Sequence, residues 1–169
     1  MNIQYRKATI EDLYEIMEMI KFAVFTMENS GIYQWDEVYP DESTIKSDIE
    51  NGDLYIGKID GRAAVIYVIN QFFDDEYKNG EWQYPNVGFR IIHRLCVHPD
   101  FQNKGVAKAA VQHIETKLRK SGVEAIRLDA FSENPYALRL YEKLGYKTVG
   151  FADWRKGRFY LMEKNLTVN

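Results

Sequence analysis

The sequence predicts an α/β fold in which a mixed, mostly antiparallel sheet of about seven strands carries about four helices on its faces. Segments of period two and of period 3.6 follow one another in the order β-α-α-β-β-β-α-β-α-β-β. Glycine and proline stand at most of the boundaries between these segments. The chain has 169 residues, of which 46% are hydrophobic. A chain of this size can form one core, so we expect a single domain over residues 1–169.

The N-terminal part is predicted to contain a short strand and two helices. Apolar and polar residues alternate over residues 3–7, which indicates a strand. Thr9 and Asp12 resemble a capping box, and apolar residues then follow at helical spacing to about Met27. Gly31 is expected to end this helix, and the aromatic, acidic segment 31–40 has no clear period. Asp41 or Ser43 caps a second, short helix that ends near residues 51–52.

The middle of the chain is predicted to be mostly strand. Asp60 and Gly61 form a strong hairpin signal between a strand at 54–58 and a strand at 62–71. Residues 74–86 are polar and contain Gly80 and Pro85, which predicts a surface loop. A further strand is expected at 87–97 and should end before Pro99.

The C-terminal part alternates helices and strands. Gly105 is expected to open a helix that Ser121 and Gly122 close, and Gly145 should end a second helix. The expected elements are a helix from 105 to 120, a strand at 125–130, a helix at 135–144, and strands at 146–153 and 158–164 with Lys156 and Gly157 in the turn between them.

Composition excludes several classes of function. The formal net charge is −3, which disfavours a protein that binds nucleic acid mainly through charge. Cys96 is the only cysteine, so an intrachain disulfide and a cysteine-built zinc site are excluded. The three histidines lack the spacing of a metal hydrolase, so we expect no metal. We find no membrane-spanning run and no signal-peptide core, and we expect a cytoplasmic protein.

The segment 95–107 carries the most chemical information. A strand runs into a short loop that opens a helix, and the first turn of a helix offers unpaired N–H donors and the positive end of its dipole. The small residues Gly105 and Ala107 would let a ligand approach this backbone closely. The pattern suits a pyrophosphate-binding site, although an ordinary turn between strand and helix has the same spacing.

Two blocks resemble the GCN5-related N-acetyltransferase (GNAT) superfamily. Residues 102–107, Gln-Asn-Lys-Gly-Val-Ala, match the Gln/Arg-x-x-Gly-x-Gly/Ala signature, with alanine in place of the second glycine. Residues 134–146 look like the second block, Asn-x-x-Ala-x-x-Leu-Tyr-x-x-x-Gly-Phe/Tyr. The resemblance implies that acetyl-coenzyme A is the co-substrate. The cofactor-binding residues that it implies are Leu95, Cys96, Val97, Gln102, Asn103, Lys104, Gly105, Val106, Ala107 and Asn134.

The resemblance also assigns roles within this set. Backbone N–H groups from about Gln102 to Ala107 would hold the pyrophosphate, and the strand edge at Cys96 and Val97 would pair with the pantetheine arm. The strands ending near Val97 and Ala130 would splay apart to admit it. Asn134 would contact the pantetheine or only cap the following helix.

The same resemblance suggests the acid of the reaction, and chemistry requires a base. Tyr141 occupies the place of the family's usual general acid, with a core aromatic as the alternative. An amine acceptor arrives as an ammonium and must lose a proton, and His93 is the best candidate base. On a regular strand His93 would share a face with Leu95 and Val97. A sheet histidine with a structural partner is the alternative, and Glu81 is a second candidate.

The acceptor pocket would be built, by resemblance, from the segment between the first two helices, the loop before the fourth strand and the last hairpin. Aromatic faces and carboxylates suit a cationic amine. The candidate substrate-binding residues are Tyr33, Trp35, Asp36, Glu81 and Trp154, with ordinary packing as the alternative.

We therefore expect an acetyl-coenzyme A-dependent N-acetyltransferase that transfers the acetyl group directly to a primary amine, favouring a small-molecule acceptor. The alternatives are acetylation of a protein N-terminus or lysine and a non-catalytic module that senses coenzyme A. Cys96 is expected to be a strand residue rather than an acyl-carrying nucleophile. We expect no nucleic-acid or membrane partner, and edge strands near the C-terminus could pair two copies as a homodimer.

Overall fold

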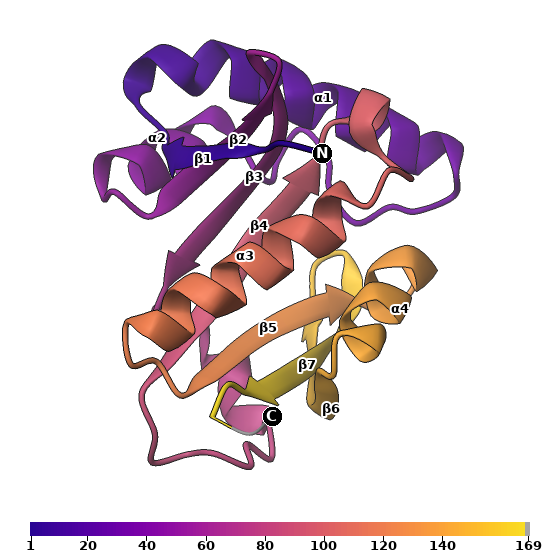
Figure 1. Cartoon of the computed structure of the whole chain (residues 1–169). Helices are drawn as coiled ribbons and strands as arrows, with labels where there is room; N and C mark the ends of the chain where they lie inside the picture. Colours follow the sequence, from indigo (N-terminus) through magenta and orange to yellow (C-terminus); the bar gives the residue numbers. More distant parts are fainter. Residues whose placement is uncertain (168–169) are drawn as a thin grey trace. The chain divides into compact units, whose positions relative to one another are not determined.

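The structure is a computed structural model that describes residues 1–167 (Figure 1). The strands follow the order β1-β2-β3-β4-β5-β7-β6 in one sheet, with β4 and β5 parallel and the other described pairs antiparallel. The predicted α/β fold with a mixed sheet is therefore confirmed. The elements are β1 (Gln4–Lys7), α1 (Leu13–Asn29), α2 (Glu42–Glu50), β2 (Leu54–Ile59), β3 (Arg62–Asn70), β4 (Phe89–Val97), α3 (Val106–Lys120), β5 (Ala125–Phe131), α4 (Pro135–Lys143), β6 (Lys147–Trp154) and β7 (Gly157–Asn165), with 3₁₀ turns η1 (Ile10–Asp12), η2 (Asp75–Asn79) and η3 (Pro99–Phe101).

The chain forms two compact units, and each combines separate stretches of sequence. The first unit contains residues Met1–Ile69 and Arg94–Ala110. The second contains Asn70–His93 and the chain from Val111 onward. Strand β4 and helix α3 each contribute residues to both units. Neither unit can therefore be cut out of the chain as one continuous segment.

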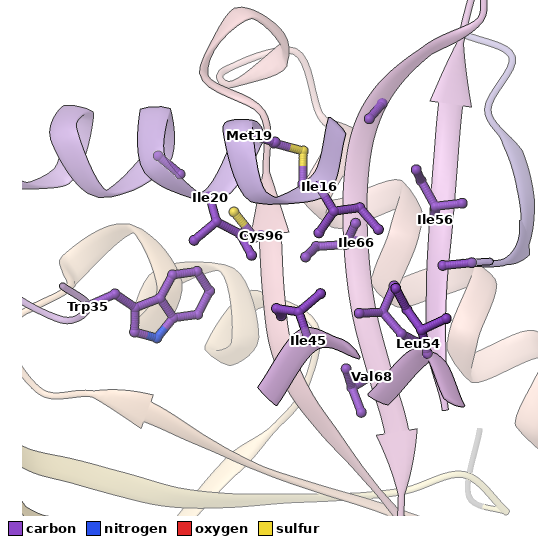
Figure 2. Packing of buried hydrophobic residues seen from close by; sticks show 14 residues of the cluster. Ile16, Met19, Ile20, Trp35, Ile45, Leu54, Ile56, Ile66, Val68 and Cys96 are labelled. Carbon is purple, nitrogen blue, oxygen red and sulfur yellow. The ribbon is translucent and has the colours of Figure 1, made fainter. Parts of the chain in front are cut away.

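The core of the first unit lies on both faces of β3, whose residues Ala63 to Val68 are all buried. On one face, α1 and α2 pack on β2 and β3 through a cluster that includes Ile16, Ile45 and Cys96 (Figure 2). On the other face, Ala64 and Val65 pack with the first turns of α3. Because both faces are covered, this strand reads in the sequence as a continuous apolar run rather than an alternation.

Local signals in the first unit form as predicted. The Asp12 carboxylate accepts a hydrogen bond of 2.8 Å from the Thr9 N–H, which is the capping-box contact, and α1 then runs to Asn29. Asp41 caps α2 by accepting from the Thr44 N–H at 2.9 Å. Asp60 and Gly61 have φ values of 50° and 79°, the left-handed conformations that a two-residue hairpin turn requires.

In the second unit, β7 lies between β5 and β6 in an antiparallel ladder. The parallel pairs between β4 and β5 end at Ile92 and Leu128, although both strands continue beyond that point. Arg127 of β5 pairs with Glu163 of β7 at 3.3 Å in the interior. This pair also fixes the loop before β4, because Glu163 accepts from the Gln83 N–H at 2.8 Å.

Three details differ from the sequence predictions. The loop 74–86 is not wholly a surface loop: it contains η2, whose Tyr77 is buried among aromatic residues. The last hairpin turn is Arg155 and Lys156, because Gly157 already pairs with Trp154. Strand β4 begins at Phe89 rather than residue 87. Among residues 1–167, no helix has both the length and the hydropathy that crossing a bilayer requires.

Candidate functional site

The segment between β4 and α3 is held by its own hydrogen bonds. The His98 N–H donates to Ala64 O at 2.9 Å, and His98 Nδ1 accepts from the Asp100 N–H at 3.1 Å. The Gln102 N–H donates to Pro99 O at 3.2 Å, and the Gln102 side chain donates to Val97 O at 3.2 Å. Gln102 therefore shapes the turn. Its N–H is engaged, so the expectation that this group holds a pyrophosphate is not met in this conformation.

The residues after Gln102 have the backbone of an anion-binding turn. Asn103 and Gly105 adopt left-handed φ values of 59° and 80°. The first bond of the helix joins the Ala109 N–H to Gly105 O at 3.0 Å. The N–H groups of Gly105, Val106 and Ala107 donate to no residue in the described part of the chain. A Cβ built on Gly105 would meet open space, so a ligand can approach these donors.

Basic side chains lie beside this turn. Lys104 is exposed, and its Nζ donates to Asp100 O at 2.8 Å. Arg62 pairs with the Asp100 carboxylate at 2.7 Å, and both cations lie over the Phe101 ring, at 5.3 Å for Arg62 and 5.8 Å for Lys104. Since Asp100 neutralises Arg62, Lys104 leaves one net positive charge at this turn, which favours a ligand with negative charge, as a diphosphate has.

The strand that leads to the turn presents its residues in two directions. Leu95 and Val97 pack with Val106 and Ala110 of α3. Cys96 lies in the cluster beneath α1 and is 5% exposed. Burial raises the pKa of the Cys96 thiol to about 12, so the thiol is protonated at neutral pH and a poor nucleophile. This supports the expectation that Cys96 is a strand residue.

Arg94 interrupts the regular alternation of β4. Its φ of 49° is left-handed, an uncommon conformation for a residue other than glycine. The period of two therefore does not carry through from His93 to Leu95. A shared face of His93, Leu95 and Val97 requires an unbroken alternation, so that expectation loses its basis at this residue.

In the second unit, α4 and its N-cap position hold the two candidate residues of the second sequence block, Tyr141 and Asn134. Asn134 caps this helix, since its side chain accepts from the Ala137 N–H at 3.2 Å, so the capping role is present. The Tyr141 ring is 7% exposed and packs edge-on against Tyr146 with 5.7 Å between centroids. The Tyr141 hydroxyl forms no hydrogen bond with any described residue. Tyr141 thus combines a fixed ring with a hydroxyl that no described residue engages.

Asp129 is a charged residue near Tyr141 that the sequence reasoning missed. It lies on β5 between Leu128 and Ala130, and its carboxylate accepts a short hydrogen bond of 2.6 Å from the Tyr77 hydroxyl. Burial and the charge of Asp129 together raise the pKa of Tyr141 well above its usual value. The available signal was an aspartate between the apolar residues Leu128 and Ala130 of a predicted strand, a position where a carboxylate is rarely tolerated without a partner.

The two candidate bases have different surroundings. His93 is the last β4 residue in the second unit, is half-buried, and has a fully buried Nε2. Glu81 is exposed and lines an open hollow of about 410 Å³ with Asn79, Val149, Gly150 and Phe151. A base that must act on a bound ammonium is better placed in a partly buried site than on an open surface, which favours His93.

The acceptor candidates of the first unit differ in exposure. Trp35 is 7% exposed and belongs to the apolar cluster of α1 and α2, where Figure 2 labels it. Asp36 closes a turn, because its Oδ1 accepts from the N–H groups of Val38 at 3.0 Å and Tyr39 at 3.2 Å. Tyr33 is 56% exposed. Trp35 therefore serves as a packing residue here, and Tyr33 is the accessible aromatic of the three.

Trp154, the acceptor candidate of the last hairpin, lies in the aromatic cluster of the second unit. Its ring contacts Phe159 edge-on at 5.2 Å and lies 6.3 Å from Tyr77. Its Nε1 is buried, and within residues 1–167 no acceptor lies in hydrogen-bond range. A buried, unsatisfied donor of this kind suits a polar ligand group. The same described residues contain no cluster of three or more His, Cys, Asp or Glu that could hold a metal ion.

Comparison with known proteins gives the family. The pattern that defines the acetyltransferase (GNAT) family matches residues 10–146. The chain belongs to the GNAT acetyltransferase family. Its fold is similar to that of a GNAT-family acetyltransferase from Streptococcus agalactiae, with a TM-score of 0.84, 24% identity, and coverage of 96% of this chain and 95% of the other.

Two curated relatives of this GNAT chain match a shorter stretch. "Acetyltransferase ECA0875" of Pectobacterium atrosepticum is 42% identical over 55 residues, which is 32% of this chain and 39% of the relative. The "[Ribosomal protein bS18]-alanine N-acetyltransferase" of Escherichia coli is 34% identical over 55 residues, 32% of this chain and 37% of the relative. The matches therefore span less than two fifths of the curated relatives' length.

Proposed function

We propose that this GNAT chain transfers the acetyl group of acetyl-coenzyme A directly to a primary amine. The observation that carries the proposal is the turn at residues 103–107, where two left-handed residues, a row of N–H donors without described acceptors and an exposed Lys104 occupy the positions of the family's signature. The transfer itself also needs a general acid and a general base.

The chain's residues fit coenzyme A. Backbone N–H groups of Gly105, Val106 and Ala107 would hold the diphosphate, with Lys104 adding charge. The backbone of Leu95 to Val97 would pair with the pantetheine amides as an added strand does. The parallel ladder of β4 and β5 already ends at Ile92, which supports such pairing. When bound, acetyl-coenzyme A supplies the activated acetyl group as a thioester.

Tyr141 is proposed as the general acid. Expulsion of a thiolate needs a proton, and a phenol can donate it. Burial and Asp129 raise the pKa of Tyr141, so the hydroxyl is protonated at neutral pH, which is the form that can donate. The absence of a hydrogen bond from this hydroxyl to any described residue supports the role, because nothing in that part of the chain competes for the proton.

His93 is proposed as the general base that accepts the proton of the acceptor ammonium. An imidazole changes charge in the pH range where the enzyme would work. The half-buried position of His93 and the exposure of Glu81 favour His93.

The acceptor is proposed to be a small-molecule amine, with the exposed Tyr33 as the candidate contact of the first unit and the Trp154 Nε1 donor as a separate candidate of the second. A second candidate is the N-terminal amine of a protein, because one relative is named for acetylation of a ribosomal protein's alanine. An interaction module that binds coenzyme A without turnover is the rival class.

An acceptor screen separates these candidates. Purified full-length protein is incubated with acetyl-coenzyme A and either pooled small amines or short peptides with free N-termini, and thiol release is followed. We expect release that requires a small amine. Release with peptides alone would replace the small-molecule acceptor with a protein N-terminus. Coenzyme A binding without thiol release from any pool would support the binding-module alternative.

A further inference from the structure

Arg94 interrupts the extended backbone of β4, directly before the residues assigned to the pantetheine. Its φ of 49° is the only left-handed value among the described residues of β4. Such a conformation is unfavourable for an arginine and persists only where the surroundings impose it. Beyond this point Cys96 faces the α1 cluster, and Leu95 and Val97 face α3.

The surroundings that impose it are two side chains of the first unit. Arg94 Nε donates to Asp48 Oδ2 at 2.7 Å and Arg94 Nη2 donates to Asp48 Oδ1 at 2.6 Å, which is a two-point pair between β4 and α2. The side chains are 12% and 9% exposed. Arg94 Nη1 also donates to the Tyr39 hydroxyl at 2.8 Å. An arginine fork is suited to such a contact because its planar geometry fixes direction as well as distance.

Tyr39 connects this pair to the α1–α2 segment (residues 30–41). The Asp36 N–H donates to Tyr39 O at 3.1 Å, and the Asp36 carboxylate accepts from the Tyr39 N–H at 3.2 Å. The α1–α2 segment also contains Tyr33, the accessible candidate for acceptor binding. One guanidinium therefore bonds to α2 and to the α1–α2 segment, while its own backbone sets the direction of the cofactor strand.

We propose that Arg94 is a positioning residue of the transfer reaction. Its pair with Asp48 fixes the left-handed backbone of β4 before Leu95, and its bond to Tyr39 holds the α1–α2 segment to that strand. The proposal rests on the proposed function, which assigns the strand after Arg94 to acetyl-coenzyme A and the α1–α2 segment to the amine. A buried ion pair by itself is weak evidence for a stabilising role. The left-handed backbone at the same residue gives this pair a specific geometric task.

The test compares three variants with one matched control. Arg94→Lys keeps the charge but cannot form the two-point contact. Arg94→Gly tolerates the left-handed φ but removes the side chain. Tyr39→Phe removes the hydroxyl through which Arg94 bonds to the α1–α2 segment. The control is Arg6→Lys, because Arg6 forms an equally short two-point pair with Asp12, at 2.7 Å and 2.7 Å, outside the proposed site.

We expect Arg94→Lys and Arg94→Gly to lower kcat/KM for acetyl-coenzyme A and for the amine by about 10- to 100-fold, as a small misplacement of reacting groups does. Tyr39→Phe should raise KM for the amine about threefold or more while KM for acetyl-coenzyme A stays unchanged. Arg6→Lys should keep the kcat and both KM values of the wild type. Melting temperatures of all four variants show which of them fold.

Two results would overturn the proposal. Wild-type kinetics in a folded Arg94→Lys or Arg94→Gly, or losses no larger than those of Arg6→Lys, would leave Arg94 with a structural role only. An unchanged KM for the amine in Tyr39→Phe would show that the bond to the α1–α2 segment has no role in catalysis. If both Arg94 variants fail to fold, this KM alone decides whether the proposal stands. A wild-type protein that transfers no acetyl group overturns the proposed function first, which distinguishes the two failures.

Discussion

Replacing Tyr141 with Phe removes one hydroxyl from a ring that is 7% exposed and leaves its packing on Tyr146 unchanged. Since that hydroxyl bonds to no described residue, its loss leaves no buried partner unsatisfied there. The free energy of unfolding should therefore change by no more than about 0.5 kcal/mol. A variant that folds as the wild type does isolates the chemical role of the hydroxyl.

The expected effect on catalysis is much larger. A positioned acid contributes about 100- to 1000-fold to kcat in this kind of proton transfer. At about 1.4 kcal/mol per factor of ten, this raises the activation barrier by about 3–4 kcal/mol. Affinity for acetyl-coenzyme A should stay within about twofold, because the donated proton matters only when the thiolate leaves.

The assay is thiol release at saturating amine, with calorimetry for coenzyme A affinity and thermal unfolding for stability. Tyr146→Phe is the matched control, because it removes a hydroxyl from the other ring of the same aromatic pair. The Tyr146 hydroxyl is buried and forms no hydrogen bond with a described residue, so its loss should change the free energy of unfolding by no more than about 0.5 kcal/mol and leave kcat unchanged. A kcat within threefold of wild type in Tyr141→Phe would refute the acid role.

Three further perturbations test the diphosphate turn, the pH dependence and the packing. Gly105→Asp should lower the affinity for coenzyme A at least about tenfold in calorimetry, because a carboxylate enters the proposed diphosphate site. The control Gly122→Asp should keep the wild-type affinity, since Gly122 has the same φ of 80° and its Cβ would also meet open space. The hydrogen bond from Arg6 holds the pKa of Asp12 far below its usual range, so its stabilisation is present above about pH 4 and is lost as pH falls further. Asp12→Asn should lower the free energy of unfolding, measured in urea, by about 1–3 kcal/mol at pH 7. The variant should also lose less of this free energy than the wild type as pH falls below about 4, and an equal loss in both proteins would contradict the prediction. Gly57→Ala should lower the melting temperature and cost about 1–3 kcal/mol, because its Cβ would lie 2.8 Å from two packed side chains; an unaltered melting curve would show that the core can yield.

The elements that the sequence predicted well are those fixed by local chemistry. The capping box at Thr9, the cap at Asp41 and the left-handed hairpin at Asp60 and Gly61 each depend on residues within three positions of one another. The turn at Gly105 belongs to the same class, since a left-handed φ is a property that glycine signals directly. These signals placed the helices and the turn at Gly105 to within one or two residues.

The features that the sequence could not predict depend on contacts between distant residues. Arg94 and Asp48 are 46 positions apart, and Tyr77 and Asp129 are 52 positions apart, so no periodicity connects them. The left-handed backbone of Arg94, which interrupts the alternation expected between His93 and Leu95, coincides with the first of these pairs. Propensity favours an ordinary extended arginine at that position, and only tertiary packing selects the left-handed one.

The roles of individual acceptor candidates also depended on packing. Aromatic and acidic composition correctly marked residues 31–40 as unusual, but composition does not distinguish a buried indole from an exposed one. Trp35 entered the core, and the Asp36 carboxylate was used to close a turn. Both outcomes follow the general preference for apolar surface to be buried and for carboxylates to accept backbone N–H groups.

The interleaved order of the two units affects how the chain can fold during synthesis. The first unit starts at Met1 but is completed only by Arg94 to Ala110. At 5–20 residues per second, a ribosome needs about 2–8 s to add residues 70–110. Until residues 89–97 of β4 have been added, β3 lacks this neighbour, although its residues Ala63 to Val68 are all buried in the finished protein. The nascent chain therefore exposes an unpaired apolar strand edge, which is the kind of surface that chaperones shield and that otherwise starts aggregation.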